Sequence, residues 1–240
     1  MGKQFVPLEC NPEVFTSLIR SLGVSETLEF HDVYSIDDPD LLSFIPRPVY
    51  ALLLVFPVSE TYEKSRIEDE KDLADDYYST ISGTDKEDAV WMKQTIGNAC
   101  GTYGLLHALA NGIDDKSITS GSALDKILHD IKPLNVADRA HYLENSDELE
   151  SQHAGVASKG DTEAPDAGAT IEFHYVCLTK AKKSGNLYEL DGRRKGPKDL
   201  GPLAPGEDML GEKALNKVRE YLKREGESGA FSIIALAPAL

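Results

Sequence analysis

The segment Gln94–Leu109, with the sequence QTIGNACGTYGLLHAL, contains the change from a polar, glycine-containing loop to an apolar helical run. Cys100 lies at this change. The first turn of a helix carries unpaired backbone N–H groups and a partial positive charge, and both favour a thiolate over a thiol. Gln94, six residues upstream, supplies an amide donor near the same point. The segment therefore predicts a cysteine nucleophile at a helix N-terminus, the first component of an acyl-transfer site.

The composition is typical of a globular protein, but the net charge is not. The 240 residues are 41% hydrophobic and 28% charged, and 41 acidic against 25 basic side chains give a formal charge of -16. So acidic a chain argues against nucleic acid and anionic membrane surfaces as partners, because their phosphates would be repelled. It suits a basic protein or peptide partner, although an acidic surface can also serve solubility alone.

The three cysteines, Cys10, Cys100 and Cys177, are too few and too scattered for a disulfide framework. No Cys/His cluster has the spacing of a metal site. The N-terminus lacks the pattern of a secretion signal, and the longest apolar run, 49–58, is about half the length of a membrane span. We therefore expect a soluble protein of a reducing compartment, the cytoplasm, with the nucleus also open.

Hydrophobic periodicity predicts helices and strands along most of the chain. The stretch Asn11-Pro12-Glu13 is typical of a helix start, and Gly23 ends the run that follows. The uniformly apolar segment 49–56 predicts a central strand buried on both faces. Segments 172–179 and 187–190, joined by a polar turn, predict a β-hairpin. Further strands are expected over 28–34 and 231–237, and helices over 39–44, 122–134, 137–149, 210–224 and the first part of 60–87. The fold class is therefore α/β or α+β, with a mainly antiparallel sheet flanked by helices.

One internal segment, 151–169, differs in composition from the rest. Ser, Gly, Asp, Ala, Pro and Thr dominate it, and large apolar residues are almost absent. This composition predicts a flexible loop, and clear strands follow it, so we expect it to lie within a single domain spanning 1–240. Long loops inside compact domains often act as lids, which makes this segment a candidate lid.

A thiolate mechanism needs an imidazole to share the proton and a further group to orient that imidazole. His107 shares the predicted helix with Cys100, but the rise of an α-helix places it roughly 10 Å away. His153 falls in the segment expected to be flexible. Three other histidines lie in elements where no partner is predicted: His31, His129 and His141.

His174 begins the first strand of the predicted hairpin, and Asp191 ends the second. If the turn centres near Lys183, the two residues fall nearly opposite each other, where Cβ atoms are about 5 Å apart. A carboxylate at this separation can fix the imidazole tautomer and stabilise the imidazolium. This geometry alone fits a catalytic pair and an ordinary strand histidine equally well.

Several separated blocks resemble the ubiquitin C-terminal hydrolases, a family of cysteine deubiquitinating enzymes. The segment from Gln94 through Cys100 to GTYGLLHA is similar to the active-site segment of that family. LYELDGR at 187–193 is similar to its aspartate motif, and FHYV at 173–176 occupies its histidine position. Two further blocks are also similar: PLECNPE at 7–13, and 30–57 with DVY at 32–34 and IPRPV at 45–49. The resemblance implies a papain-like cysteine-hydrolase fold with a knotted chain.

The resemblance also implies an activity. The expected enzyme cleaves small adducts or peptide extensions from the C-terminal glycine of ubiquitin through a thioester. Cys100 would be the nucleophile, His174 the general base and acid, and Asp191 the group that orients the imidazole. Gln94 and the backbone N–H of Cys100 would form the oxyanion hole. No cofactor or metal is needed, and we expect a monomer.

The family resemblance further suggests how ubiquitin binds. Asp32 would contact the arginine-bearing C-terminal tail, and Glu9 and Glu13 are candidates for the same surface. Ordinary solvated acids are the alternative for all three. Segment 151–169 would be the crossover loop that limits the size of the leaving group. Two other functions stay open: the same chemistry on another ubiquitin-like protein, and a ubiquitin-binding module with little catalysis.

Overall fold

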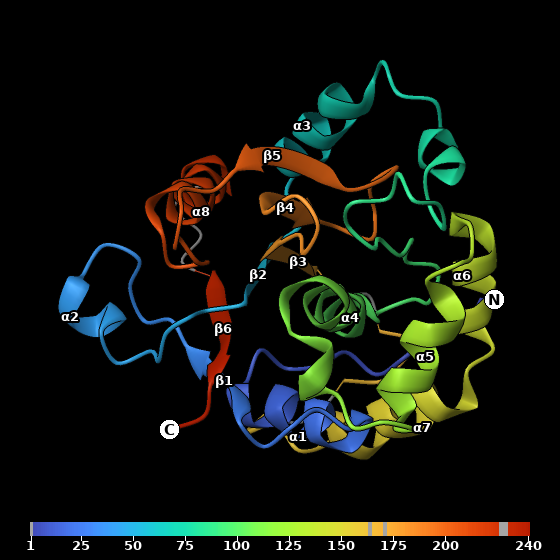
Figure 1. Cartoon of the computed structure of the whole chain (residues 1–240), viewed down its shortest axis with the longest axis horizontal. Helices are drawn as coiled ribbons and strands as arrows, with labels where there is room; N and C mark the ends of the chain where they lie inside the picture. Colours follow the sequence, from blue (N-terminus) through green and yellow to red (C-terminus); the bar gives the residue numbers. More distant parts are fainter. Residues whose placement is uncertain (1, 163–164, 170–171, 226–229) are drawn as a thin grey trace.

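The computed structural model describes residues 2–162, 165–169, 172–225 and 230–240. Its centre is a six-stranded antiparallel sheet with the strand order β1-β6-β2-β3-β4-β5 (Figure 1). This mixed architecture confirms the fold class predicted from the sequence pattern. The strands are β1 (Leu28–Asp32), β2 (Ala51–Pro57), β3 (Phe173–Lys180), β4 (Asn186–Leu190), β5 (Lys198–Pro202) and β6 (Ser232–Pro238).

Helices cover both faces of the sheet. One face is covered by α1, α4, α5 and α7, whereas α8 covers the other, with α3 beside it (Figure 1). No helix in the described residues is long and apolar enough to cross a membrane. The helices are α1 (Pro12–Leu22), α2 (Pro39–Leu42), α3 (Glu60–Glu70), α4 (Cys100–Gly112), α5 (Ala123–Ile131), α6 (Val136–Glu144), α7 (Asp147–Ala157) and α8 (Glu212–Glu225), with short 3-10 turns at Tyr77–Thr80 and Asp115–Ser117.

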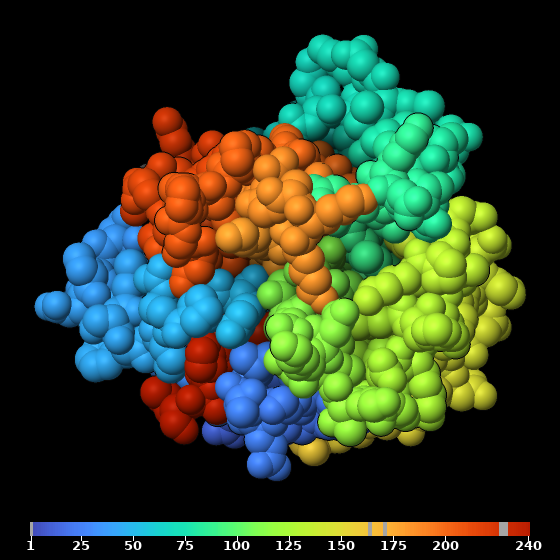
Figure 2. Space-filling model, in the orientation of Figure 1, coloured from blue at the N-terminus to red at the C-terminus, as the bar shows by residue number. Residues whose placement is uncertain are grey.

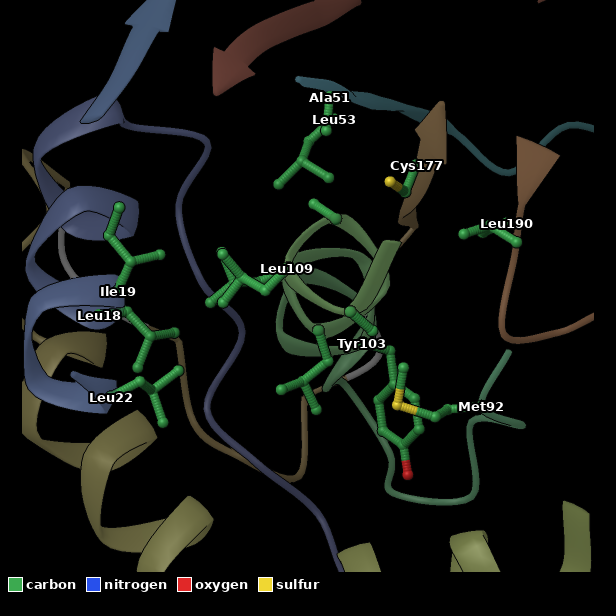
Figure 3. Close-up of a cluster of buried hydrophobic side chains, with 14 of the residues drawn as sticks. Leu18, Ile19, Leu22, Ala51, Leu53, Met92, Tyr103, Leu109, Cys177 and Leu190 are labelled. Atoms are coloured by element: carbon green, nitrogen blue, oxygen red, sulfur yellow. The ribbon is translucent and has the colours of Figure 1, made fainter. Parts of the chain in front are cut away.

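Strand β2 is buried on both faces, as its apolar run predicts. Leu53 and Val55 belong to the core formed with α1 and α4, whereas Leu52, Leu54 and Phe56 belong to the core formed with α8. Side chains of a strand alternate between the two faces, so an uninterrupted apolar run serves two cores at once. The first core is drawn in Figure 3, where Leu18, Ile19 and Leu22 of α1 lie across from Leu109 of α4, with Leu53 above them.

The predicted start of the first helix is also confirmed. The Asn11 side chain accepts a hydrogen bond from the backbone N–H of Glu13 (2.8 Å), and Gly23, at φ 98°, ends α1. The segment before this helix runs beside the loop that leads to Cys100. Phe5 N–H donates to the carbonyl of Gly97 (2.9 Å), which anchors the N-terminus next to the expected nucleophile.

Two expectations about chain segments were wrong. The helix expected over 137–149 is two helices, because Ser146 caps the start of α7 and accepts a bond from Leu149 N–H (3.1 Å). Residues 151–157, expected in the flexible loop, belong to α7, where His153 and Val156 are buried against the core. The short helix α2 and the segment 60–88 form two separate projections of the surface (Figure 2).

Candidate active site

Cys100 is the first residue of α4, as predicted. This helix is buried along almost its whole length against β3, β2 and α1. The residue that follows is a glycine, and a Cβ on Gly101 would lie 3.3 Å from the Phe15 ring and 3.4 Å from the Leu8 side chain. Because this position carries no side chain, the N-terminal segment packs closely against the first turn of α4, while Cys100 itself stays only partly buried.

The imidazole of His174 lies in a buried pair with Asp191. Its Nε2 is 2.7 Å from Asp191 Oδ1, and both side chains are almost fully buried. The β3–β4 ladder pairs Cys177 with Leu190, so His174 lies beyond the end of the ladder and is displaced by two residues from the position directly opposite Asp191. The side chains meet diagonally, a geometry that still brings the predicted pair into contact.

Electrostatics favour the charged forms of this pair. Burial lowers the pKa of His174, but the Asp191 carboxylate and a hydrogen bond with the Cys100 thiol outweigh it and raise this pKa to about 9. Burial raises the pKa of Asp191. Even so, His174, Tyr62 and the Arg193 N–H together hold the pKa of this carboxyl well below its usual range. Since Nε2 is engaged by Asp191, Nδ1 is the ring nitrogen that can share a proton with Cys100.

Residues that the sequence analysis did not single out complete the surroundings of Asp191. The Tyr62 hydroxyl donates to Oδ2, and the Arg193 N–H donates to Oδ1 (2.9 Å). The indole N–H of Trp91 donates to the backbone carbonyl of Asp191 (3.0 Å). Tyr62 and Trp91 are far from Asp191 in the chain, so neither has a local sequence signal that could have identified it.

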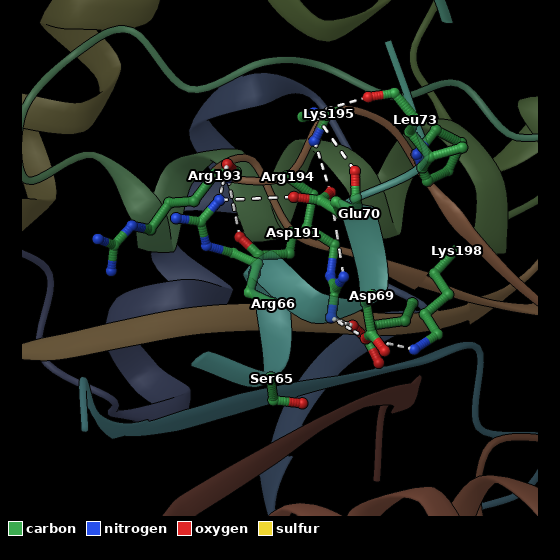
Figure 4. Close-up of polar contacts among 12 residues, drawn as sticks. Ser65, Arg66, Asp69, Glu70, Leu73, Asp191, Arg193, Arg194, Lys195 and Lys198 are labelled. Atoms are coloured by element: carbon green, nitrogen blue, oxygen red, sulfur yellow. Dashed lines mark hydrogen bonds and ion pairs between the residues drawn. The ribbon is translucent and has the colours of Figure 1, made fainter. Parts of the chain in front are cut away.

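A network of ion pairs holds the chain immediately after Asp191 against α3 (Figure 4). Arg194 is buried and pairs with Asp69 (3.2 Å) and with Glu189 (2.9 Å). The backbone N–H of Lys195 donates to Glu70 (2.7 Å). This network fixes the turn that follows β4 and thereby the backbone that carries the Asp191 carboxylate.

Gln94 lies beside the same turn. Its backbone N–H donates to the carbonyl of Gly192 (2.9 Å), and a Cβ on Gly192 would lie only 2.8 Å from the Cβ of Gln94. A glycine after Asp191 is therefore required for the loop of Gln94 to approach. The Gln94 side-chain amide donates one hydrogen to the Ile96 carbonyl (3.1 Å).

Cys100 opens into a cavity of about 350 Å³. Leu8, Cys10, Tyr175 and Phe173 contribute to its walls. Cys10 thus shares a cavity with the expected nucleophile although 90 residues separate them in the chain. Burial raises the pKa of the Cys10 thiol to about 12, so Cys10 stays protonated at neutral pH.

The three acidic residues predicted to bind substrate lie together. Glu9, Glu13 and Asp32 line an open hollow of about 340 Å³, which also contains Asp161 and shares Glu9 and Cys10 with the cavity at Cys100. Asp32 is exposed and accepts a hydrogen bond from the Tyr34 hydroxyl (3.2 Å). The hollow therefore gathers negative charge next to the cavity of Cys100.

The segment after α7 borders this hollow. Glu9 accepts hydrogen bonds from the backbone N–H (3.0 Å) and hydroxyl (2.7 Å) of Thr162, and these bonds outweigh burial and lower the pKa of Glu9. The Asn98 side chain, on a residue with φ 58°, donates to the carbonyls of Ala167 (2.8 Å) and Ala169 (3.0 Å). Parts of the predicted loop thus contact both the acidic hollow and the loop before Cys100. Residues 163–164 of that loop lie outside the described part of the chain.

Two other histidines have structural partners. His107 is fully buried, and its Nε2 accepts from the Met92 N–H (3.0 Å) while burial lowers its pKa to about 4. His153, predicted to be in a flexible segment, lies on α7 instead. It joins Thr102 Oγ1 (2.7 Å) to the carbonyl of Val6 (2.7 Å), and so connects α4 with the N-terminal segment.

Comparison with known proteins identifies relatives over almost the whole chain. The family model for ubiquitin carboxyl-terminal hydrolase, family 1, matches residues 5–223. Ubiquitin carboxyl-terminal hydrolase 3 of Arabidopsis thaliana is 35% identical over 237 residues, covering 98% of this chain and 95% of its own length. A ubiquitin carboxyl-terminal hydrolase of Drosophila melanogaster is 36% identical over 235 residues, with 98% of each chain covered.

A solved structure has the same fold. The UCH37 catalytic domain of Trichinella spiralis, bound to ubiquitin vinyl methyl ester, is similar with a TM-score of 0.74 at 24% identity, covering 100% of this chain and 97% of that one. The identity of the sequence relatives, the extent of the family match and the shared fold agree with one another. The chain belongs to the ubiquitin carboxyl-terminal hydrolase family 1.

Proposed function

We propose that this protein is a cysteine deubiquitinase that cleaves small adducts or peptide extensions from the C-terminal glycine of ubiquitin. The observation that carries the proposal is the series Cys100, His174 and Asp191, in which the last two are buried and Cys100 lies at the wall of an open cavity. A nucleophile, a base and an orienting carboxylate in this order are the parts that thiol-dependent acyl transfer requires. The relatives with matching sequences carry the name of the same activity.

The proposed mechanism begins with an ion pair. With the pKa of His174 raised to about 9, the imidazole holds a proton at neutral pH, which stabilises the Cys100 thiolate beside it. The thiolate attacks the glycine carbonyl, and His174 donates its proton to the leaving amine. Water activated by the now neutral His174 then hydrolyses the thioester. Asp191 holds the ring through both steps.

Charge on the developing oxyanion needs preorganised donors. The backbone N–H of Cys100 at the start of α4 is one proposed donor. The Gln94 amide is the second proposed donor, because the Ile96 carbonyl takes only one of its two hydrogens. The close contact of Gln94 with Gly192 keeps its backbone fixed while charge develops.

We further propose that the acidic hollow binds the basic C-terminal tail of ubiquitin. Asp32 and Glu13 are exposed there, and the formal charge of the chain, -16, attracts a cationic tail over a longer range. Glu9 is bonded to Thr162, so its carboxylate would have to exchange this partner for an arginine of the tail. The hollow adjoins the cavity of Cys100, since Glu9 and Cys10 line both, so a tail bound there would end near Cys100.

The central test is covalent labelling. We expect ubiquitin with a C-terminal electrophile to form a 1:1 adduct with this protein at neutral pH, and the adduct to be absent in Cys100→Ser. Intact-mass spectrometry measures the adduct, and Cys177→Ser is the matched control because Cys177 is buried away from the cavity. A probe built on a ubiquitin-like protein is run in parallel. Labelling by that probe alone, or no labelling of a folded sample, would contradict the proposal.

A second test concerns the leaving group. Thr162 and Pro165, from the segment after α7, line the cavity at Cys100, and this segment also contacts Glu9 and Asn98. We therefore expect ubiquitin with a short peptide extension to be cleaved at least about 100-fold faster than a compact ubiquitin dimer, because a folded leaving group does not fit beneath the segment. Measured kcat/KM values for the two substrates decide the point. Equal values would show that the segment does not act as a size filter.

A further inference from the structure

The carboxylate of Asp191 has a separate donor for each oxygen. Oδ1 accepts from His174 Nε2 (2.7 Å) and from the Arg193 N–H (2.9 Å), whereas Oδ2 accepts from the Tyr62 hydroxyl. Asp191 has no solvent exposure, so water does not replace a lost donor without rearrangement. Among the described residues, Tyr62 supplies the hydrogen bond to Oδ2, the oxygen that His174 and Arg193 do not hold.

The Tyr62 side chain is itself held on several sides. Its backbone N–H donates to Ser59 Oγ (2.9 Å) in the first turn of α3, which fixes its position on the helix. The ring has no exposed surface, and its centroid lies 5.3 Å from that of Phe56 and 5.9 Å from that of His174. The guanidinium of Arg224 lies over the same ring, 5.5 Å from its centroid. A ring packed on these sides can direct its hydroxyl only towards Asp191.

The Tyr62 hydroxyl stays protonated, and therefore a donor, at neutral pH. Burial, and next the charge of Asp191, raise the pKa of Tyr62 far above its usual range. A permanently protonated phenol donates to the carboxylate in each step of the reaction. It cannot be a proton carrier for the same reason, so its contribution is geometric.

We propose that Tyr62 is a positioning residue for the proposed reaction: its hydroxyl holds the Asp191 carboxylate in the plane that keeps His174 directed at Cys100. The expected effect on catalysis rests on the proposed function. The hydrogen bond between His174 and Asp191, by contrast, is present without substrate. When the hydroxyl is removed, Oδ2 is a buried acceptor without a donor, and the carboxylate is held at Oδ1 alone, about which it can turn. The imidazole would then lose its fixed orientation.

The test compares two buried tyrosines. Tyr62→Phe removes the hydroxyl and keeps the ring. Tyr221→Phe is the matched control, because Tyr221 is equally buried and packs on the same Phe56 ring (5.1 Å between centroids), but its hydroxyl forms no hydrogen bond with Asp191 in the described structure. We expect Tyr62→Phe to lower kcat for a fluorogenic ubiquitin C-terminal amide about 10-fold, the lower end of what loss of an outer hydrogen-bond partner costs, with KM unchanged. Tyr221→Phe should retain the wild-type kcat.

A second readout does not depend on activity. The proton between His174 Nε2 and Asp191 should give a downfield proton NMR signal in the free protein, assigned by its absence in His174→Gln. We expect this signal to be present in wild type and Tyr221→Phe, and broadened or lost in Tyr62→Phe. Circular dichroism spectra and melting curves of the variants establish that each is folded.

The outcomes separate the two hypotheses. If wild type does not process ubiquitin, the proposed function fails, and the NMR comparison still decides whether Tyr62 positions Asp191. If Tyr62→Phe keeps both the wild-type kcat and the NMR signal, the positioning role is wrong. Equal losses in Tyr62→Phe and Tyr221→Phe would also overturn it, because they would reflect packing alone.

Discussion

Replacement of Asp191 by asparagine should lower kcat about 10⁴-fold, by analogy with the loss of the orienting carboxylate in other triads. The Asp191 carboxylate can only accept a hydrogen from His174 Nε2, so it fixes the tautomer in which Nδ1 serves Cys100. An amide can also donate to Nε2 and thereby favour the opposite tautomer. Steady-state cleavage of a fluorogenic ubiquitin amide measures the loss.

The pH dependence of the same variant provides a separate check. Asp191 raises the pKa of His174 to about 9, and the imidazolium that stabilises the thiolate is therefore present at neutral pH and lost as the pH rises through this value. Without the carboxylate, burial lowers the pKa of His174. We expect the alkaline limb of the kcat/KM profile near pH 9 in wild type and at lower pH in Asp191→Asn.

The control for this substitution is Asp40→Asn, which makes the same change in charge on the exposed side of α2. It should leave both kcat and the pH profile unchanged. If Asp191→Asn retained more than about a tenth of wild-type kcat, the carboxylate would not be the orienting group of the proposed triad.

Loss of the Gln94 amide should have the next largest effect. One oxyanion donor contributes about 3–4 kcal/mol to transition-state stabilisation, so Gln94→Ala should lower kcat about 100- to 1000-fold. The oxyanion exists only after attack by the thiolate, and we therefore expect KM to remain close to that of wild type. Single-turnover kinetics with a ubiquitin C-terminal amide measure the acylation step directly.

A matched control and a second variant make this result specific. Gln152→Ala removes a half-exposed glutamine from α7 and should be neutral. Gln94→Glu keeps the size of the side chain but replaces the donor by an acceptor, so it should lose as much activity as Gln94→Ala. Near-normal kcat in both Gln94 variants would exclude the amide from the oxyanion hole.

Much of the fold was predictable because its signals are local. Asn11 and Gly23 delimit α1 through bonds within a few residues, and the apolar run of β2 reflects burial on two faces. The β3–β4 hairpin was predictable for the same reason, since a short polar turn sets its register to within two residues. Strand β5 was missed because residues 198–202 lack alternating apolar residues and are paired only with the edge of β4.

Some residues of the candidate site could likewise be predicted from local sequence patterns, whereas others could not. Local sequence patterns predicted a cysteine at the start of α4 and the hairpin that brings His174 near Asp191, because a helix start and a hairpin are features of local order. The acids of the hollow were expected only from the family resemblance. The residues that surround Asp191 could not be predicted in this way. Neither could the presence of Cys10 in the cavity of Cys100 or the burial of His153 on α7. These contacts join segments 50 to more than 100 residues apart, as in Tyr62 to Asp191, and arise from the packing of helices on a sheet, for which no local pattern exists.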